Sequence, residues 1–274
     1  MMNVETLVKF LEEMVLNGVE ITTSKIQKGN TVLTGISIGY GNIRPTLYVE
    51  DYENSFRVGG YELVAKEMLK AINQAELPKI DIATISTWKY ARENLILCIA
   101  PKGTNQGVVT FPYRDLELYV RVQIMEMGTY KITEELLNLW KISKEKLLMT
   151  AKLHGIQSYI IYPISFDEPQ FVSPNDFKYD IAEQMYAISN TRHLYGSGIM
   201  FHKDILKTIA DKVNEDLLIF PSSIHEIIIT IYGNQNMTEV NAMIHDINIT
   251  EISPDEVLSN HAYIFHKDTM EITY

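Results

Sequence analysis

A short segment near the C-terminal end of the chain groups four side chains that could do chemistry: Ser222, Ser223, His225 and Glu226. A serine hydroxyl activated by a histidine, which is itself oriented by an acid, carries out nucleophilic acyl transfer. Ser223 and His225 share a face on an extended backbone, whereas Ser222 and His225 share one on a helix. One hypothesis is therefore a hydrolase or small-ligand enzyme in which His225 activates Ser222 or Ser223. Glu226 or a more distant acid would orient the histidine.

The same segment also fits a structural turn. Two apolar runs, 217–220 and 227–232, flank it and are typical of strands. Pro221 ends the first run, and the glycines of a G-x-S-x-G nucleophile elbow are absent. In this interpretation Ser223 accepts a backbone N–H bond within the turn, and Glu226 reaches back toward it. The turn is the preferred interpretation, which favours a non-catalytic protein over an enzyme.

No other motif completes a metal or cofactor site. Seven histidines occur without H-E-x-x-H or H-x-x-x-H spacing, and one cysteine cannot supply a structural zinc site, so no metal is predicted. The G-x-G triplets at 39–41 and 196–198 lack the Gly-Lys-Ser/Thr of a phosphate-binding loop. We interpret them as turns, and no cofactor is predicted. Phe-His-Lys-Asp occurs at 201–204 and again at 265–268, which we interpret as two similar strand exits.

The elements that must position these residues begin with a small first lobe. Apolar residues at helical spacing predict a helix over 3–17, and a second periodic run predicts one over 61–75. Between them, runs rich in β-branched residues predict strands at 19–23, 31–38 and 46–50. Residues 1–76 are therefore predicted to form a helix, three-strand, helix lobe.

Residues 77–274 are predicted to form a larger lobe in which strands and helices alternate irregularly. The steady βα rhythm of a doubly wound sheet is missing, which favours an α+β fold with mostly antiparallel sheets and flanking helices. Ser253, Pro254 and Glu256 match a capping box with proline at the first helical position, so a helix is predicted to begin there. A final strand pair is predicted at 262–265 and 271–273.

The net charge of −11 is concentrated near the C-terminal end. From Glu215 to Tyr274, ten acidic residues accompany the single base Lys267, so this segment carries nine of the eleven net charges. A nucleic-acid backbone would be repelled by such a surface, and no cluster of basic and aromatic residues offsets it. Nucleic acid is therefore disfavoured as a partner, and another protein is favoured.

The composition also predicts a compartment. The only cysteine, Cys98, lies in an apolar run, so no internal disulfide can form and a reducing environment is expected. No secretory signal and no apolar stretch long enough to cross a bilayer is present. We expect a cytoplasmic protein without membrane contact.

Four segments resemble an uncharacterised domain-of-unknown-function family of Firmicutes and their phages or mobile elements. The most characteristic is 216–226, with Pro-Ser-Ser-Ile-His-Glu at 221–226 followed by an isoleucine-rich strand. The others are 33–36 with 44–50, 132–143, and 252–259, and they occur along the chain in the same order as in the family. The resemblance implies a bacterial or phage cytoplasmic protein, and it transfers no reaction, cofactor or catalytic residue.

These observations favour a non-catalytic binding or regulatory protein whose acidic C-terminal lobe contacts another macromolecule. The incomplete catalytic motifs, the uneven charge and the resemblance to a family of mobile elements all support this hypothesis. In a phage setting the role would extend to interference with host defence. The alternative is the hydrolase or small-ligand enzyme that uses His225 with Ser222 or Ser223.

Overall fold

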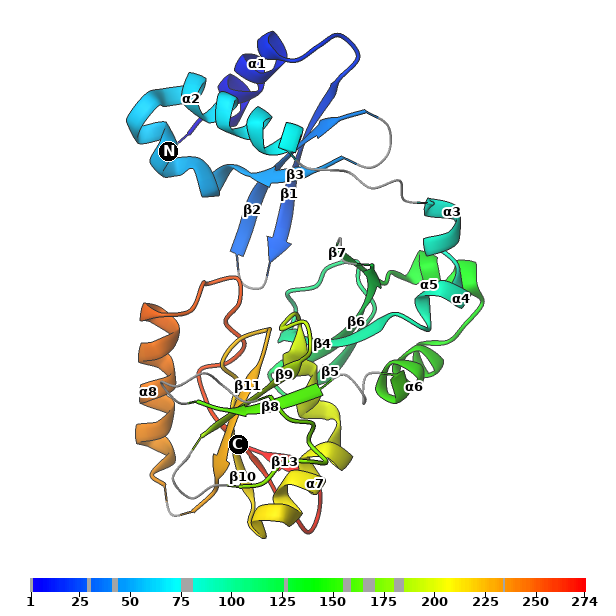
Figure 1. Ribbon diagram of the computed structural model, residues 1–274, viewed down its shortest axis with the longest axis vertical. Helices are drawn as coiled ribbons and strands as arrows, with labels where there is room; N and C mark the ends of the chain where they lie inside the picture. Colours follow the sequence, from blue (N-terminus) through cyan, green and yellow to red (C-terminus); the bar gives the residue numbers. More distant parts are fainter. Residues whose placement is uncertain are drawn as a thin grey trace. The chain divides into compact units, whose positions relative to one another are not determined.

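The computed structural model describes residues 2–28, 31–40, 44–74, 81–125, 128–154, 159–164, 171–179, 185–233 and 235–274. The chain divides into two compact units, which we call the N-terminal unit (Met1–Ile80) and the C-terminal unit (Asp81–Tyr274). The predicted lobe boundary between residues 76 and 77 falls in 75–80, outside the described residues. Every strand pair is antiparallel, which confirms the predicted α+β class (Figure 1).

The N-terminal unit packs two helices on a three-stranded sheet of order β1-β2-β3. Its elements are α1 (Val4–Met14), β1 (Glu20–Lys28), β2 (Thr31–Gly39), β3 (Thr46–Tyr48), the 3-10 helix η1 (Val49–Tyr52) and α2 (Glu53–Gln74). Asn3 caps α1, because its side chain accepts the Thr6 N–H. Helix α2 is kinked at Gly60, whose φ of 64° strongly favours glycine. The core includes buried side chains from both helices and β2, among them Leu7, Leu11, Ile36, Ile38, Val64 and Met68.

The C-terminal unit contains the remaining elements. Its first half comprises α3 (Ile82–Ile85), α4 (Trp88–Ala91), β4 (Leu95–Pro101), β5 (Thr110–Tyr113), β6 (Leu116–Ile124), β7 (Gly128–Lys131), α5 (Glu134–Trp140) and α6 (Lys144–His154). Its second half comprises β8 (Tyr159–Pro163), β9 (Tyr186–Asn190), the 3-10 helix η3 (Gly196–Phe201), α7 (Lys203–Val213), β10 (Leu217–Phe220), β11 (Ile227–Ile231), α8 (Met237–Thr250), β12 (Tyr263–Phe265) and β13 (Ile272–Thr273).

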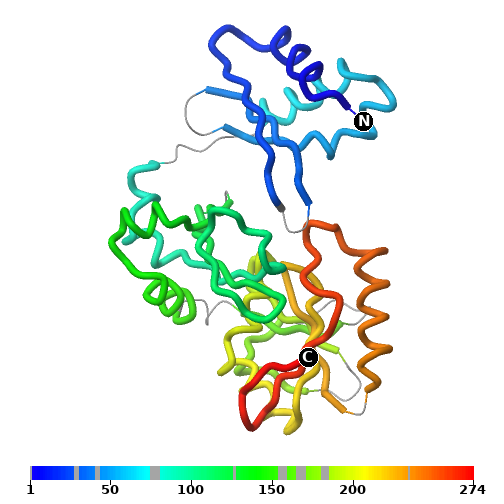
Figure 2. Tube along the Cα trace, turned by 180° about the vertical axis from the view of Figure 1, so that it is seen from behind, coloured from blue at the N-terminus to red at the C-terminus, as the bar shows by residue number. Residues whose placement is uncertain are grey.

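Two sheets organise this unit. In the smaller sheet β6 pairs with β4 along one edge and with β5 and then β7 along the other. The larger sheet has the order β13-β12-β10-β11-β9-β8. After α8 the chain returns to this sheet and ends in the β12–β13 hairpin, which is drawn in red in Figure 2.

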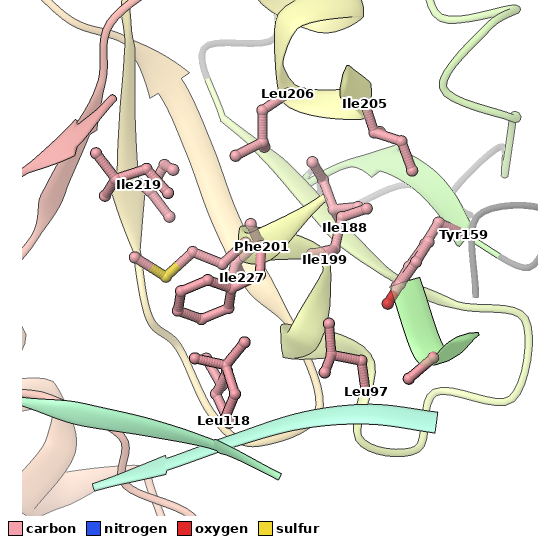
Figure 3. Close-up of a cluster of buried hydrophobic side chains, with 14 of the residues drawn as sticks. Leu97, Leu118, Tyr159, Ile188, Ile199, Phe201, Ile205, Leu206, Ile219 and Ile227 are labelled. Atoms are coloured by element: carbon pink, nitrogen blue, oxygen red, sulfur yellow. The ribbon is translucent and has the colours of Figure 1, made fainter. Parts of the chain in front are cut away.

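One apolar core joins the two sheets. Side chains from β4, β6, η3, α7 and all six strands of the larger sheet contribute to it, and Figure 3 shows part of it. The labelled members are Leu97, Leu118, Tyr159, Ile188, Ile199, Phe201, Ile205, Leu206, Ile219 and Ile227. All of them are at least nine-tenths buried. Their burial supplies the main driving force for folding of this unit, since stabilisation scales with apolar area removed from water.

The larger sheet is covered on both faces. Leu217 and Ile219 point into the core that contains α7, whereas Leu218 and Phe220 join a second cluster with Ile244 of α8. Alternate residues of a strand face opposite sides, so a strand with helices on both sides is apolar throughout. This arrangement explains the uninterrupted Leu-Leu-Ile-Phe of β10.

The capping-box prediction at Ser253 is wrong. Residues 254–256 form a turn, in which the Glu256 N–H donates to the Ser253 carbonyl over 2.8 Å. The Ser253 hydroxyl donates to Asp255 instead of capping a helix. Leu258 must be buried, and the chain must reach β12 within a few residues, so too little length remains for a helix.

None of the helices among the described residues combines the length and apolar character needed to cross a membrane.

Candidate functional site

The four predicted site residues lie in the loop 221–226, which joins β10 to β11. The loop closes through backbone bonds, since the Ser222 N–H donates to the Phe220 carbonyl and the Ser223 N–H to the Glu226 carbonyl. The Ser223 hydroxyl oxygen accepts the His225 N–H over 3.0 Å. Ser223 thus stabilises the turn through its own side chain.

The two ring nitrogens of His225 have other partners. Its Nδ1 accepts the Tyr195 backbone N–H over 3.3 Å, so the neutral ring carries its proton on Nε2. That Nε2 lies 3.3 Å from an oxygen of Glu256. Tyr195 has a φ of 57°, and this left-handed conformation aims its N–H at the ring. Within the described residues neither ring nitrogen bonds a serine hydroxyl.

Glu226 and Ser222 are also placed differently from the triad geometry. The Glu226 carboxylate accepts the hydroxyl of Tyr162 on β8 over 2.6 Å. Burial, and then this hydrogen bond and the glutamate charge, raise the pKa of Tyr162. The half-buried Ser222 hydroxyl forms no hydrogen bond within the described part of the chain. The four residues are therefore neighbours in one loop, but no two of their side chains hydrogen-bond to each other within the described residues.

Glu256 is a site residue that sequence reasoning missed. The turn at 254–256 carries its side chain to His225, and its carbonyl accepts the Ile224 N–H over 3.0 Å. The acid that faces the histidine therefore comes from a segment 31 residues away in the chain. The capping-box pattern at 253–256 concealed this role of Glu256, because the same residue types also favour the start of a helix.

Two buried serines donate hydrogen bonds to carbonyl groups of the loop 221–226. Ser189 of β9 donates its hydroxyl to the His225 carbonyl, and Ser197 of η3 donates to the Ile224 carbonyl, both over 2.7 Å. Each serine is fully buried, so each hydroxyl satisfies a carbonyl that would otherwise lose its bond to water. The guanidinium carbon of Arg121 lies 4.5 Å from the centroid of the Tyr195 ring. Tyr195 is the residue whose N–H bonds to His225.

A second histidine–carboxylate pair lies between the β5–β6 turn and β12. Asp115 accepts bonds from the Tyr263 hydroxyl (2.9 Å), from the Ser259 hydroxyl (3.1 Å) and from His261 Nε2 (3.0 Å). The other ring nitrogen of His261 faces the Ala262 carbonyl at 3.2 Å. Burial first, and then the Asp115 charge, raise the pKa of Tyr263. This cluster ties residues 259–263 to the smaller sheet.

A third pair includes a hydroxyl on the far side of the ring. His266 Nδ1 lies 2.9 Å from an oxygen of Asp216, and its Nε2 lies 2.9 Å from the Thr273 hydroxyl. The second oxygen of Asp216 accepts the Lys267 N–H over 2.7 Å. Burial opposes ionisation of Asp216, but the Lys267 N–H and His266 outweigh it and lower the pKa of this carboxyl.

Comparison with known proteins places the chain in a family. A family of unknown function, DUF5688, matches residues 3–267. The chain belongs to DUF5688. No curated protein and no solved structure matches the chain.

The DUF5688 match spans both units and includes the loop 221–226 with its partner Glu256. It also includes Asp216 and His266, whereas Thr273 lies beyond the matched range. Among the described residues of this DUF5688 chain, no three histidine, cysteine, aspartate or glutamate side chains converge as metal ligands would.

The two Phe-His-Lys-Asp segments have different surroundings. Phe201 and Phe265 both belong to the core, but the histidines that follow them have different surroundings. His202 precedes α7, is buried, and packs against the Tyr159 ring at 5.1 Å. Its Nε2 has no hydrogen-bond partner among the described residues. Burial, and then the Lys152 charge, lower the pKa of His202 to about 4.

His202 is expected to make the C-terminal unit sensitive to acid. In the unfolded chain the His202 ring takes up a proton near pH 6.5, whereas in the folded chain it does so only near pH 4. The unfolding free energy should therefore fall as pH drops through this window, by up to about 3 kcal/mol. Urea unfolding of His202→Phe should show a flatter pH dependence than the wild type. The exposed His245→Gln should retain the wild-type slope; equal slopes in His202→Phe and wild type would contradict the assignment.

Proposed function

We propose that this DUF5688 chain is a binding or regulatory protein whose acidic C-terminal surface contacts a basic partner protein. The family resemblance supports a cytoplasmic role in bacteria, their phages or mobile elements, and action on host defence fits that setting. The outer surface of α8 is the observation that carries the proposal.

The outer surface of α8 combines exposed apolar side chains with unpaired carboxylates. Met243 and Ile247, which lie one turn apart, are 44% and 43% exposed. Asp246 and the following Glu251 form no ion pair with any described residue. Adjacent exposed apolar groups are typical of contact surfaces, and free carboxylates favour a basic partner over a nucleic acid.

The inner surface of α8 is firmly attached to the unit. Ile244 is buried in the cluster with Leu218, and the Asn248 side chain donates to the Ser259 carbonyl over 2.9 Å. The Asn241 side chain accepts the Ala262 N–H over 3.0 Å. Because both asparagines anchor the helix to residues 259–262, α8 presents its outer side chains in a fixed arrangement. A preorganised surface loses less entropy on binding.

The partner should offer apolar side chains flanked by lysine or arginine. An amphipathic basic helix meets both requirements, because its apolar stripe can cover Met243 and Ile247 while its cations approach Asp246. The attraction between opposite charges should increase the association rate, and this increase should become smaller as the salt concentration rises.

Affinity capture with matched variants tests the proposal. Tagged wild type and Met243→Lys should be compared in lysate of the native host, with partners quantified by mass spectrometry. We expect a stoichiometric basic protein that Met243→Lys loses by at least about tenfold, since a buried cation at an interface core costs more than about 1.4 kcal/mol. Added salt should weaken the same interaction.

Leu139→Lys is the matched control, because Leu139 is a 65% exposed residue on another helix of the same unit. It should retain the partner. A partner that both variants retain, or both lose, would place the contact elsewhere, and a well-expressed chain without a stoichiometric partner would argue against a binding function.

A further inference from the structure

We propose that Asp216, His266 and Thr273 form a nucleophilic relay that transfers an acyl group from a small activated ester to the Thr273 hydroxyl. This activity goes beyond the proposed binding function and uses a different part of the C-terminal unit. The relay consists of an acid, an imidazole and an alcohol in line, joined by two contacts of 2.9 Å.

Strand register places the three residues on one face of the larger sheet. Leu217 of β10 pairs with Phe265 of β12, so the preceding Asp216 and the following His266 lie opposite each other. Thr273 of β13 pairs with Ile264 and therefore shares the sheet face of His266. Asp216 directly precedes β10, His266 directly follows β12, and Thr273 lies diagonally to His266 on the edge strand β13.

The hydrogen bonds select the tautomer that a general base needs. The Asp216 carboxylate only accepts hydrogen bonds, so it favours a proton on His266 Nδ1. The Nε2 lone pair then faces the Thr273 hydroxyl. The Lys267 N–H holds the second carboxylate oxygen and thereby fixes the orientation of Asp216. This order of acid, imidazole and alcohol is the one that activates a hydroxyl nucleophile.

The other two histidine–carboxylate pairs of the described residues lack this arrangement. In His225 a backbone N–H occupies Nδ1, so Nε2 carries the proton and faces a carboxylate. In His261 both ring nitrogens face oxygen acceptors, a carboxylate and the Ala262 carbonyl. His266 is the member of the three whose free lone pair is directed at an alcohol.

The reaction proceeds in two balanced halves. Thr273 Oγ1 bonds to the ester carbonyl carbon while its proton passes to His266 Nε2, and the intermediate then expels the alcohol, which takes that proton. The acyl group is left as an ester on Thr273. Water next attacks the acyl carbon and gives a proton to Nε2, which returns it to Thr273 Oγ1 as the carboxylic acid leaves. No oxidant or further reactant is needed.

The relay is open to a small substrate. The His266 side chain is 34% exposed, and Thr273 is half-buried on the edge strand. Because no strand covers β13 on its outer side within the described residues, an ester can approach the hydroxyl from that edge. A compact acyl group suits such a position better than a long chain.

The full-length chain should be tested with p-nitrophenyl acetate. Thr273→Val and His266→Gln should each lower the hydrolysis rate by at least about tenfold, since general-base catalysis typically contributes 10²–10⁴-fold. Thr273→Ser should retain activity because it keeps the hydroxyl. Peptide mass mapping after brief exposure to the ester should find the acetyl group on residue 273.

Asp216 acts as a positioning residue, and its test needs a different readout. Asp216→Asn offers an amide that can donate to the ring and favour the wrong tautomer. We expect the pH–rate profile to change its midpoint and its plateau to fall, with Asp216→Glu recovering part of the rate. A profile that keeps both its midpoint and its plateau would remove Asp216 from the relay.

The matched control is His193→Asn, which removes an exposed histidine at a φ of 50°, a conformation that asparagine tolerates. This variant should hydrolyse the ester at the wild-type rate. The proposal fails if Thr273→Val is as active as the wild type, or if His193→Asn loses as much activity as His266→Gln, since surface imidazoles would then explain the turnover. If Thr273→Val does not fold, absence of an acetyl group on residue 273 in both wild type and Thr273→Ser overturns the proposal.

Discussion

Gly198→Ala is expected to destabilise the C-terminal unit by about 3 kcal/mol or more, a larger loss than most single substitutions cause. A Cβ atom at this position would lie 1.9 Å from the Leu97 carbonyl oxygen and 2.7 Å from its carbon. Both atoms belong to the backbone of β4, so no side-chain rotation can relieve the clash. Either η3 or β4 must move, and each carries core residues.

The displacement should also reach the loop 221–226. Gly196, two residues earlier, is equally close-packed, because a Cβ there would lie 2.6 Å from the Asn190 nitrogen and 2.7 Å from the His225 carbonyl oxygen. A shift of η3 therefore moves Tyr195, whose N–H holds the His225 ring. We expect the His225 resonances of Gly198→Ala to change even where the unit remains folded.

Tryptophan fluorescence during urea unfolding measures this effect in the right unit, since both tryptophans, Trp88 and Trp140, lie in the C-terminal unit. Gly233→Ala is the matched control: its Cβ would meet only a flexible Gln235 side chain at 3.7 Å. Its unfolding free energy should stay within about 0.5 kcal/mol of the wild type. A Gly198→Ala variant as stable as the control would show that η3 does not pack this closely on β4.

Asp115→Ala is expected to cost the C-terminal unit about 3 kcal/mol of unfolding free energy. The substitution removes the acceptor of three side chains: the hydroxyls of Ser259 and Tyr263 and the ring of His261. Tyr263 is completely buried, so its hydroxyl would lose its partner without gaining water. Most of the loss in unfolding free energy should come from this buried hydroxyl donor, which is left without an acceptor.

A double-mutant cycle with Tyr263→Phe isolates that part. Tyr263→Phe should destabilise the wild type but cost little in the Asp115→Ala background, with a coupling energy of about 1–2 kcal/mol. The exposed Asp268→Ala serves as the control for loss of an aspartate in the same acidic region and should change stability by less than about 0.5 kcal/mol. Additive effects of Asp115→Ala and Tyr263→Phe would contradict a direct bond between them.

The three histidine–carboxylate pairs share a structural consequence. Each joins a residue of 251–274 to an earlier part of the C-terminal unit: Glu256 to His225, His261 to Asp115, and His266 to Asp216. Glu256 and both histidines of 251–274 therefore attach this segment to the rest of the unit. Asp246 on α8 and Glu251 directly after it take no part in these three pairs, as the proposed contact with a basic partner requires.

Local patterns in the sequence determined the element types. The helical spacing of Leu7 and Leu11 and the continuous apolar run of β10 correspond to α1 and β10 as observed. Such predictions succeed because a residue's period along the chain sets the face it presents, whatever lies opposite. The turn at 221–226, with Ser223 as its internal acceptor, follows from the same local chemistry.

Long-range packing decided what the sequence could not. Glu256 faces His225, and Gly198 lies against β4, because segments distant in the chain meet in the fold. The triplet 196–198 shows the difference clearly: the sequence favoured turn glycines, whereas close backbone approach requires both of them. Likewise, the partners of the His225 ring are the Tyr195 N–H and Glu256, and the contacts of His266 with Asp216 and Thr273 depend on strand register. Local propensity acts on neighbours in the chain, while side-chain partners depend on how strands pair, and only the tertiary structure determines that pairing.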